Sequence, residues 1–193
     1  MQQRWWPAVL TLALVASGCS QQQSASTASV ATAAPQAAAP HAAQANPAGD
    51  IPDTQLFVPY ASSGGYSVLA PEGWSRSTQG SDVTFTWHYD GERAVETRGA
   101  SSTGAALAAI RSAFAGVRDA KAKTVTLPSG PATLITYTSD SATDAVTGKR
   151  IRLENNSYVF ARGGKSVRVD LWAPLGADNV DQWRKISRSF AWK

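Results

Sequence analysis

Two segments of alternating polar and apolar residues, 151–161 and 165–172, constrain the fold more than any other feature of the chain. The pair Gly163-Gly164 lies between them, and two glycines joining such segments are typical of a β-hairpin turn. A two-residue turn places Arg162 opposite Lys165 and brings apolar side chains together on one face. These are the pairs Phe160 with Val167 and Tyr158 with Val169, followed by Leu171. The sequence therefore predicts an antiparallel hairpin with one apolar face.

The apolar pattern changes phase near the start of the first segment. In an uninterrupted strand, Ile151 and Leu153 fall on the face opposite Tyr158. One extra residue near Asn155-Asn156 would return them to the apolar face. We therefore expect a β-bulge at this pair.

The second face of the hairpin carries the strongest candidate for a ligand or partner site. With the bulge, this face holds three arginines and a tryptophan: Arg150, Arg152, Arg168 and Trp172. Arginines beside an aromatic side chain suit an anionic ligand or a partner protein. The alternative is an ordinary solvated face, or one that a helix covers with the arginine stems packed down.

Further short strands are expected before this hairpin, with turns rich in glycine and proline between them. They cover residues 66–70, 82–89, 92–98, 121–127 and 132–138. Asp90-Gly91 is interpreted as the turn between the second and third of these strands. Residues 139–149 are polar and predict a loop.

Two helices are expected. Apolar residues recur on one helical face after the capping candidates Ser101, Ser102 and Thr103, at Leu107, Ile110, Phe114 and Val117. A second helix is predicted after Asp178, an N-cap candidate, with a stripe formed by Val180, Trp183 and Ile186. The order of elements predicts an α+β domain in which an antiparallel β-sheet has flanking helices.

The N-terminus has the layout of a secretory signal peptide. A single basic residue, Arg4, precedes the short apolar run 8–16, and small residues follow. The tetrapeptide ending at Cys19, Ala-Ser-Gly-Cys, resembles a bacterial lipobox, which implies lipid attachment at this cysteine. A catalytic or zinc-binding role fits less well, because Cys19 lies outside the foldable segment and the chain has only two histidines. An ordinary cleaved signal peptide is the remaining alternative.

Three regions follow from these patterns: a signal peptide at 1–18, a flexible tether at 19–55 and a folded domain at 56–193. The tether is nearly all Ala, Gln, Ser, Thr and Pro, and such a segment cannot bury enough apolar surface to offset the entropy of ordering. The domain has no cysteine, so its stability must come from packing.

Composition and motifs favour a protein without catalysis or cofactor. The net charge of +4 is small and scattered, which argues against nucleic-acid binding. No G-x-G motif occurs, and His88, the one histidine of the domain, is interpreted as a solvated strand-end residue. We expect no metal, no cofactor and a monomeric domain.

Two stretches resemble a known family. One runs from Tyr66 to Trp74 and reads YSVLAPEGW, and the other runs from Trp172 to Trp192 and contains GADNVD and QWRKISRSF. Together they are similar to the PsbP-like superfamily and, within it, to lipid-anchored LpqN-like proteins of actinobacteria. The resemblance implies an α-β-α sandwich and a non-catalytic binding or assembly role, and it supplies no catalytic residues.

The function expected from the sequence is that of an extracytoplasmic lipoprotein, anchored in the cell membrane, whose domain binds an envelope protein partner. In a Gram-negative source, Ser20 would instead favour the outer membrane. A small-molecule or lipid-binding carrier is the alternative, with a cleft between the sheet and a helix. A hydrolase ranks third.

Overall fold

The computed structural model describes residues 49–99 and 101–193, so Cys19, the signal peptide and most of the tether lie outside the described residues. Strands account for most of this region, and neither described helix is long and apolar enough to span a bilayer. The α+β class predicted from the sequence is confirmed.

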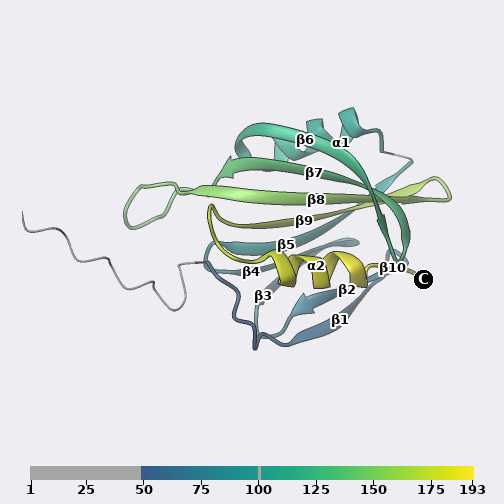
Figure 1. The fold of residues 1–193 in the computed structure, drawn as a ribbon, viewed down its shortest axis with the longest axis horizontal. Coiled ribbons are helices and arrows are strands. Elements are labelled where there is room, and N and C mark those ends of the chain that lie inside the picture. The colour runs from purple at the N-terminus through teal and green to yellow at the C-terminus, as the bar shows by residue number, and fades with distance from the viewer. Residues whose placement is uncertain (1–48, 100) are drawn as a thin grey trace, which may run out of the picture. The chain divides into compact units, whose positions relative to one another are not determined.

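The main layer is a seven-stranded antiparallel sheet (Figure 1). Its strands, in spatial order, are β3 (Ser75–Gln79), β4 (Asp82–Trp87), β5 (Asp90–Arg98), β9 (Lys165–Pro174), β8 (Arg152–Arg162), β7 (Gly130–Asp140) and β6 (Ala115–Leu127). A second, three-stranded sheet consists of β1 (Phe57–Ser62), β2 (Tyr66–Pro71) and β10 (Ala191–Trp192).

The two helices cover opposite faces of the seven-stranded sheet. Helix α1 (Thr103–Ala113) buries Ile110 against Ile135 and Val159, which defines the α1 face. Helix α2 (Val180–Ser189) and the small sheet bury the other side, the α2 face, where Val167 and Leu171 lie. Because neighbouring residues of a strand point to opposite faces, both sets of residues alternate along β8 and β9.

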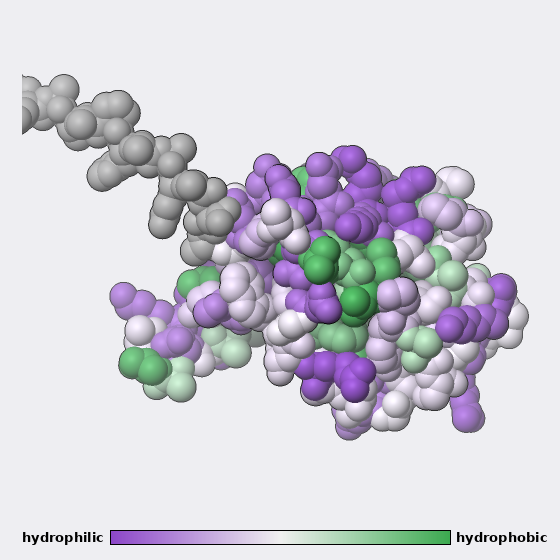
Figure 2. Space-filling view, turned by 90° about the horizontal axis from the view of Figure 1, so that it is seen from below, coloured by the Kyte–Doolittle hydropathy of each residue, from purple (hydrophilic) through white to green (hydrophobic). Residues whose placement is uncertain are grey.

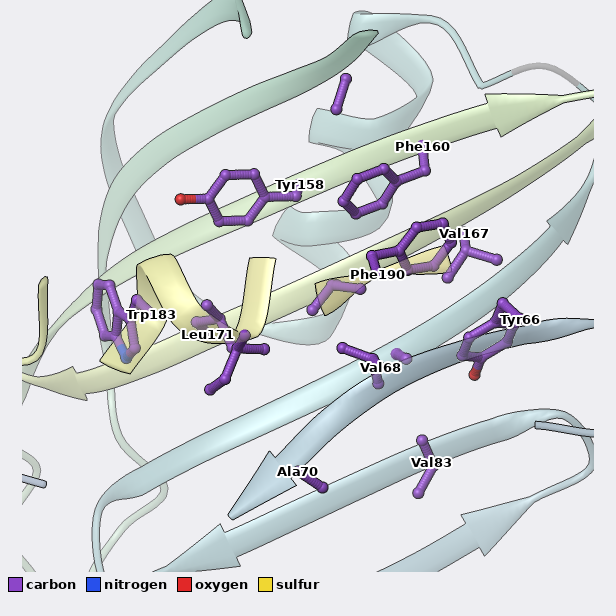
Figure 3. Packing of buried hydrophobic residues seen from close by; sticks show 14 of the residues in the cluster. Tyr66, Val68, Ala70, Val83, Tyr158, Phe160, Val167, Leu171, Trp183 and Phe190 are labelled. Atoms are coloured by element: carbon purple, nitrogen blue, oxygen red, sulfur yellow. The ribbon is translucent and has the colours of Figure 1, made fainter. Parts of the chain in front are cut away.

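The aromatic centre of the larger core lies on the α2 face (Figure 3). Phe190, at the end of α2, stacks on Phe160 of β8 with ring centroids 3.9 Å apart. Tyr66 of β2 also stacks on the Phe190 ring, with the ring centroids 5.9 Å apart. Phe190 therefore joins α2, the small sheet and the large sheet.

The predicted hairpin is confirmed and the predicted bulge is wrong. β8 and β9 pair as expected, and their register continues without a shift through Asn155 opposite Trp172. Leu153 and Asn155 stay on the α1 face and are buried there, with 4% and 2% of their surface exposed. The apolar phase changes because both faces of β8 are buried, so no extra residue is needed.

The turn between β4 and β5 lies two residues earlier than predicted. It consists of His88 and Tyr89, and His88 takes a φ of 52°. Gly91 belongs to β5, where the indole of Trp172 covers it so closely that a Cβ would overlap the ring. The glycine at this position thus reflects a close approach within the sheet and not a turn.

Both helix ends also differ from the predictions. Ser102 caps α1 as expected, but the helix ends at Ala113, and Phe114 becomes extended and packs edge-on against Trp172. Val117 lies in β6. Helix α2 has Asn179 at its N-cap position in place of the predicted Asp178.

The folded part begins by residue 49, within the segment assigned to the tether from the sequence. Ile51 is 3% exposed, and its N–H donates to Oδ1 of Asn179 at 2.7 Å. The Asn179 amide donates to the carbonyl of Gly49 at 2.8 Å, and Nε2 of Gln182 donates to the carbonyl of Ile51 at 3.0 Å. This occupation of the Asn179 side chain explains why it makes no capping bond to α2.

Candidate binding clefts

The helices cover different halves of the sheet, and a cleft lies beside each of them. On the α2 face, α2 leaves part of β6, β7 and β8 open and borders the first cleft. On the α1 face, the end of α1 borders the second cleft, over β3, β4 and β5. The two clefts therefore open on opposite faces of the sheet.

The first cleft has a volume of about 640 Å³ and an apolar floor. The buried side chains of Leu134, Tyr158 and Trp183 belong to this floor, and Figure 3 shows Tyr158 on β8 and Trp183 on α2 at the same end of the core. Val125 and Leu127 of β6 continue the floor toward the sheet edge. Apolar clefts of this size are typical of small-molecule sites.

Charged side chains surround the mouth of the first cleft. Lys121, Arg184 and Arg188 are basic, whereas Asp119 and Glu154 are acidic. Burial raises the pKa of Glu154, although a backbone hydrogen bond from Gly176 opposes this rise. An apolar floor with a mixed, slightly basic mouth suits an amphipathic ligand.

The second cleft is of similar size, about 650 Å³, and more polar. Trp172 and Phe114 supply its aromatic surfaces, with ring centroids 5.5 Å apart. Ser77, Thr84 and Arg93 line it along three adjacent strands, and Asp82 adds a carboxylate to the lining.

The four residues predicted as one site do not lie together. Arg168 and Trp172 are on the α1 face, as expected, but without the bulge Arg152 projects on the α2 face, where it pairs with Asp140 at 3.0 Å. Arg150 precedes β8 and donates from Nε to the hydroxyl of Thr143. Only Trp172 of the four lines a cleft.

Arg168 is buried in the sheet and pairs with a neighbouring carboxylate. It is 8% exposed, and its Nε donates to Oδ1 of Asp170 at 2.7 Å. The same oxygen accepts a hydrogen bond from Ser157 at 2.6 Å. A helix-covered sheet face with packed arginine stems, the alternative stated above, describes Arg168 better than a ligand site does.

Two buried carboxyl groups lie on the α2 face of β5 and were not singled out from the sequence. Asp90 is 1% exposed, and one of its oxygens accepts a long hydrogen bond of 3.4 Å from Asn179. Burial raises the pKa of Asp90 to about 7, and the nearby charge of Asp50 adds to the rise. Glu92 is 1% exposed, neither carboxyl oxygen has a partner among the described residues, and burial raises its pKa well above the ordinary value.

The geometry brings together no metal-binding cluster among the described residues. No group of three or more His, Cys, Asp or Glu residues within 49–99 and 101–193 is placed to hold a metal ion. His88 is an exposed turn residue, beside the ring of Trp87.

The sequence signals for the clefts were weak. Arg93 stands in the run Glu-Arg-Ala-Val-Glu, where no periodic pattern separates a cleft residue from a solvated one. The first cleft depends on how far α2 extends across the sheet, which the sequence of α2 does not specify. The sequence pointed to the first cleft only through the carrier alternative, which expected a cleft between the sheet and a helix.

Comparison with known proteins finds solved structures that are similar to this chain, but it does not assign the chain to a family. No family model matches the sequence, and no curated protein matches it. A crystal structure of a protein from Bacteroides thetaiotaomicron VPI-5482 is similar at 12% identity and a TM-score of 0.45; the match covers 69% of this chain and 47% of that one, so the chain spans about half of its length. The solution structure of cyanobacterial PsbP (CyanoP) from Synechocystis sp. PCC 6803 is similar at 16% identity and a TM-score of 0.44, over 75% of this chain and 98% of that one.

Proposed function

We propose that this protein is a non-catalytic binding module, held at the extracytoplasmic face of a membrane by a lipid on Cys19, and that the first cleft is its binding site. The observation that carries the binding proposal is the apolar floor of this cleft, formed by Leu134, Tyr158 and Trp183 beneath a charged mouth. A ligand with an apolar body and a polar end would bury the floor and keep its polar end in water.

Substitutions at two neighbouring residues of β6 can test whether the first cleft binds the ligand. Val125 lies on the cleft side of β6, whereas its neighbour Thr124 lies on the other side. We expect Val125→Arg to abolish binding of a fluorescent fatty acid by the full chain in detergent, because the guanidinium would stand on the apolar floor. Thr124→Arg adds the same charge outside the cleft and should bind as the wild type does.

Equal binding by both variants would place the ligand elsewhere. Native mass spectrometry of the protein isolated from its own membranes provides a second readout. Protein without any bound small molecule in such a preparation would count against a carrier.

The anchor is tested by cell fractionation. The lipobox-like sequence before Cys19 motivates the proposal, since acylation of this thiol would provide a stable attachment. We expect Cys19→Ala to move the protein from the membrane fraction to the soluble fraction, while Ser26→Ala, a neutral change in the tether, leaves it in the membrane. A Cys19→Ala protein that stays in the membrane would contradict lipid attachment.

A protein partner is the second candidate, and an exposed apolar surface favours it. Leu56 and Val58 are 65% and 42% exposed at the start of β1. Figure 2 views the side of the molecule where β1, β2 and β3 lie in Figure 1, and apolar residues gather at its centre within a hydrophilic border. If a partner docks here, Val58→Glu should prevent its recovery by cross-linking in membranes, and Val125→Arg should not.

A further inference from the structure

The second cleft contains an arginine, Arg93, whose side chain pairs with none of the described residues. Arg93 lies in a row of residues across the α1 face, between Thr84 of β4 and Asp170 of β9. Asp170 is fully buried and already pairs with Arg168 at 2.7 Å. Within residues 49–99 and 101–193, the Arg93 side chain forms no ion pair or hydrogen bond, and it is partly exposed to the cleft.

Aromatic surfaces lie on the same side of the sheet. The indole of Trp172 lies across Gly91, which pairs with it in the neighbouring row. Phe114 contacts this indole edge-on, with the ring centroids 5.5 Å apart. The absence of a side chain at Gly91 therefore lets the ring lie flat on the sheet, two residues along β5 from Arg93.

We propose that the second cleft binds a small planar carboxylate, with Arg93 as the anion-binding group and Trp172 with Phe114 as the aromatic surface. A guanidinium matches a carboxylate with two parallel hydrogen bonds, and a flat ligand can then pack against the indole. The hydroxyl groups of Ser77 and Thr84 border the same space and can bind polar ring substituents.

Asp82 limits the charge of the ligand. It lines the cleft, and one of its oxygens accepts the N–H of Glu96 at 3.0 Å. A carboxylate that lines the same cleft as Arg93 disfavours a ligand with two or more negative charges. The cleft therefore suits a monocarboxylate better than a phosphate, and this site is independent of the first cleft.

The test measures binding of benzoate, the probe, to the full chain in detergent by ligand-observed NMR titration. We expect saturable binding that Arg93→Gln weakens about tenfold or more, because a charge-assisted pair of hydrogen bonds is lost. Arg93→Lys keeps the positive charge but loses the paired hydrogen-bond geometry. Its affinity for benzoate should therefore lie between that of the wild type and that of Arg93→Gln. Arg76→Gln is the matched control, since Arg76 lies on the edge strand β3, with β4 between it and β5, and projects to the other face.

Thermal melting confirms that each variant is folded before it is titrated. Three results would overturn the proposal: no saturable benzoate binding by the wild type, equal binding by Arg93→Gln, or inorganic phosphate binding more tightly than benzoate in an Arg93-dependent way. Loss of fatty-acid binding in Val125→Arg with unchanged benzoate binding would show that the two clefts act separately.

Discussion

The free energy of unfolding is expected to fall by several kcal/mol as the pH rises from 4 to 8, because Asp90 and Glu92 are buried as neutral acids. The folded-state pKa of Asp90 is about 7 against an ordinary 3.8, and that of Glu92 is also raised. A raised folded-state pKa gives stability that is fully present below the unfolded-state pKa and is lost as the pH rises through the folded-state value. Asp90 alone contributes a loss on the order of 3 kcal/mol between pH 4 and pH 7, because the slope approaches about 1.4 kcal/mol per pH unit only between the two pKa values.

Urea unfolding at a series of pH values measures this loss. Asp90→Asn and Glu92→Gln remove one titrating group each, so each should flatten the profile, and the double variant should flatten it most. Glu72→Gln, at an exposed acid, is the control and should keep the wild-type slope. A wild-type profile that is flat between pH 4 and pH 8 would contradict the neutral burial of these carboxyl groups.

Phe190→Ala is expected to destabilise the domain by about 3–5 kcal/mol, the range for removing a fully buried aromatic side chain. Phe190 is 2% exposed and contacts aromatic rings of three elements, Tyr66, Phe160 and Trp192. Its loss leaves a cavity where α2 meets both sheets, and β10 follows directly after it.

Thermal unfolding followed by circular dichroism checks this prediction, with an expected fall in Tm on the order of 10–20 °C for a domain of this size. Val180→Ala is the matched control, since Val180 belongs to the same helix and is 61% exposed. It should change the free energy of unfolding by less than about 0.5 kcal/mol. A similar loss in both variants would mean that the Phe190 stack contributes little.

The hairpin register was predictable from the sequence because a two-glycine turn fixes the pairing of every residue that follows it. The position of Leu153 in the apolar pattern was misinterpreted for a physical reason. Alternation of polar and apolar residues distinguishes the two faces of a strand only when one face is exposed to water. β8 is buried on both sides, so an apolar residue on the α1 face carries no signal of a bulge. The arginine grouping depended on that bulge and was therefore wrong for Arg150 and Arg152.

Gly91 shows a second limit of local patterns. Asp-Gly is a strong turn signal, yet here the glycine makes room for Trp172, which lies 81 positions later in the sequence. Similarly, Phe114 continues the apolar stripe of α1, but contact with Trp172 and Tyr137 holds it in an extended segment after the helix. Long-range contacts decided both positions, and neither contact is visible in a window of neighbouring residues.

The docking of residues 49–53 sets where mechanical load would enter the domain. Their side-chain and backbone hydrogen bonds to the C-terminal region run to Asp178, Asn179 and Gln182, at the start of α2, and none of these bonds involves β6, β7 or β8. Tension on the chain before residue 49 would therefore act first on α2, which forms one wall of the first cleft. A pull along the chain would thus load a wall of the cleft directly.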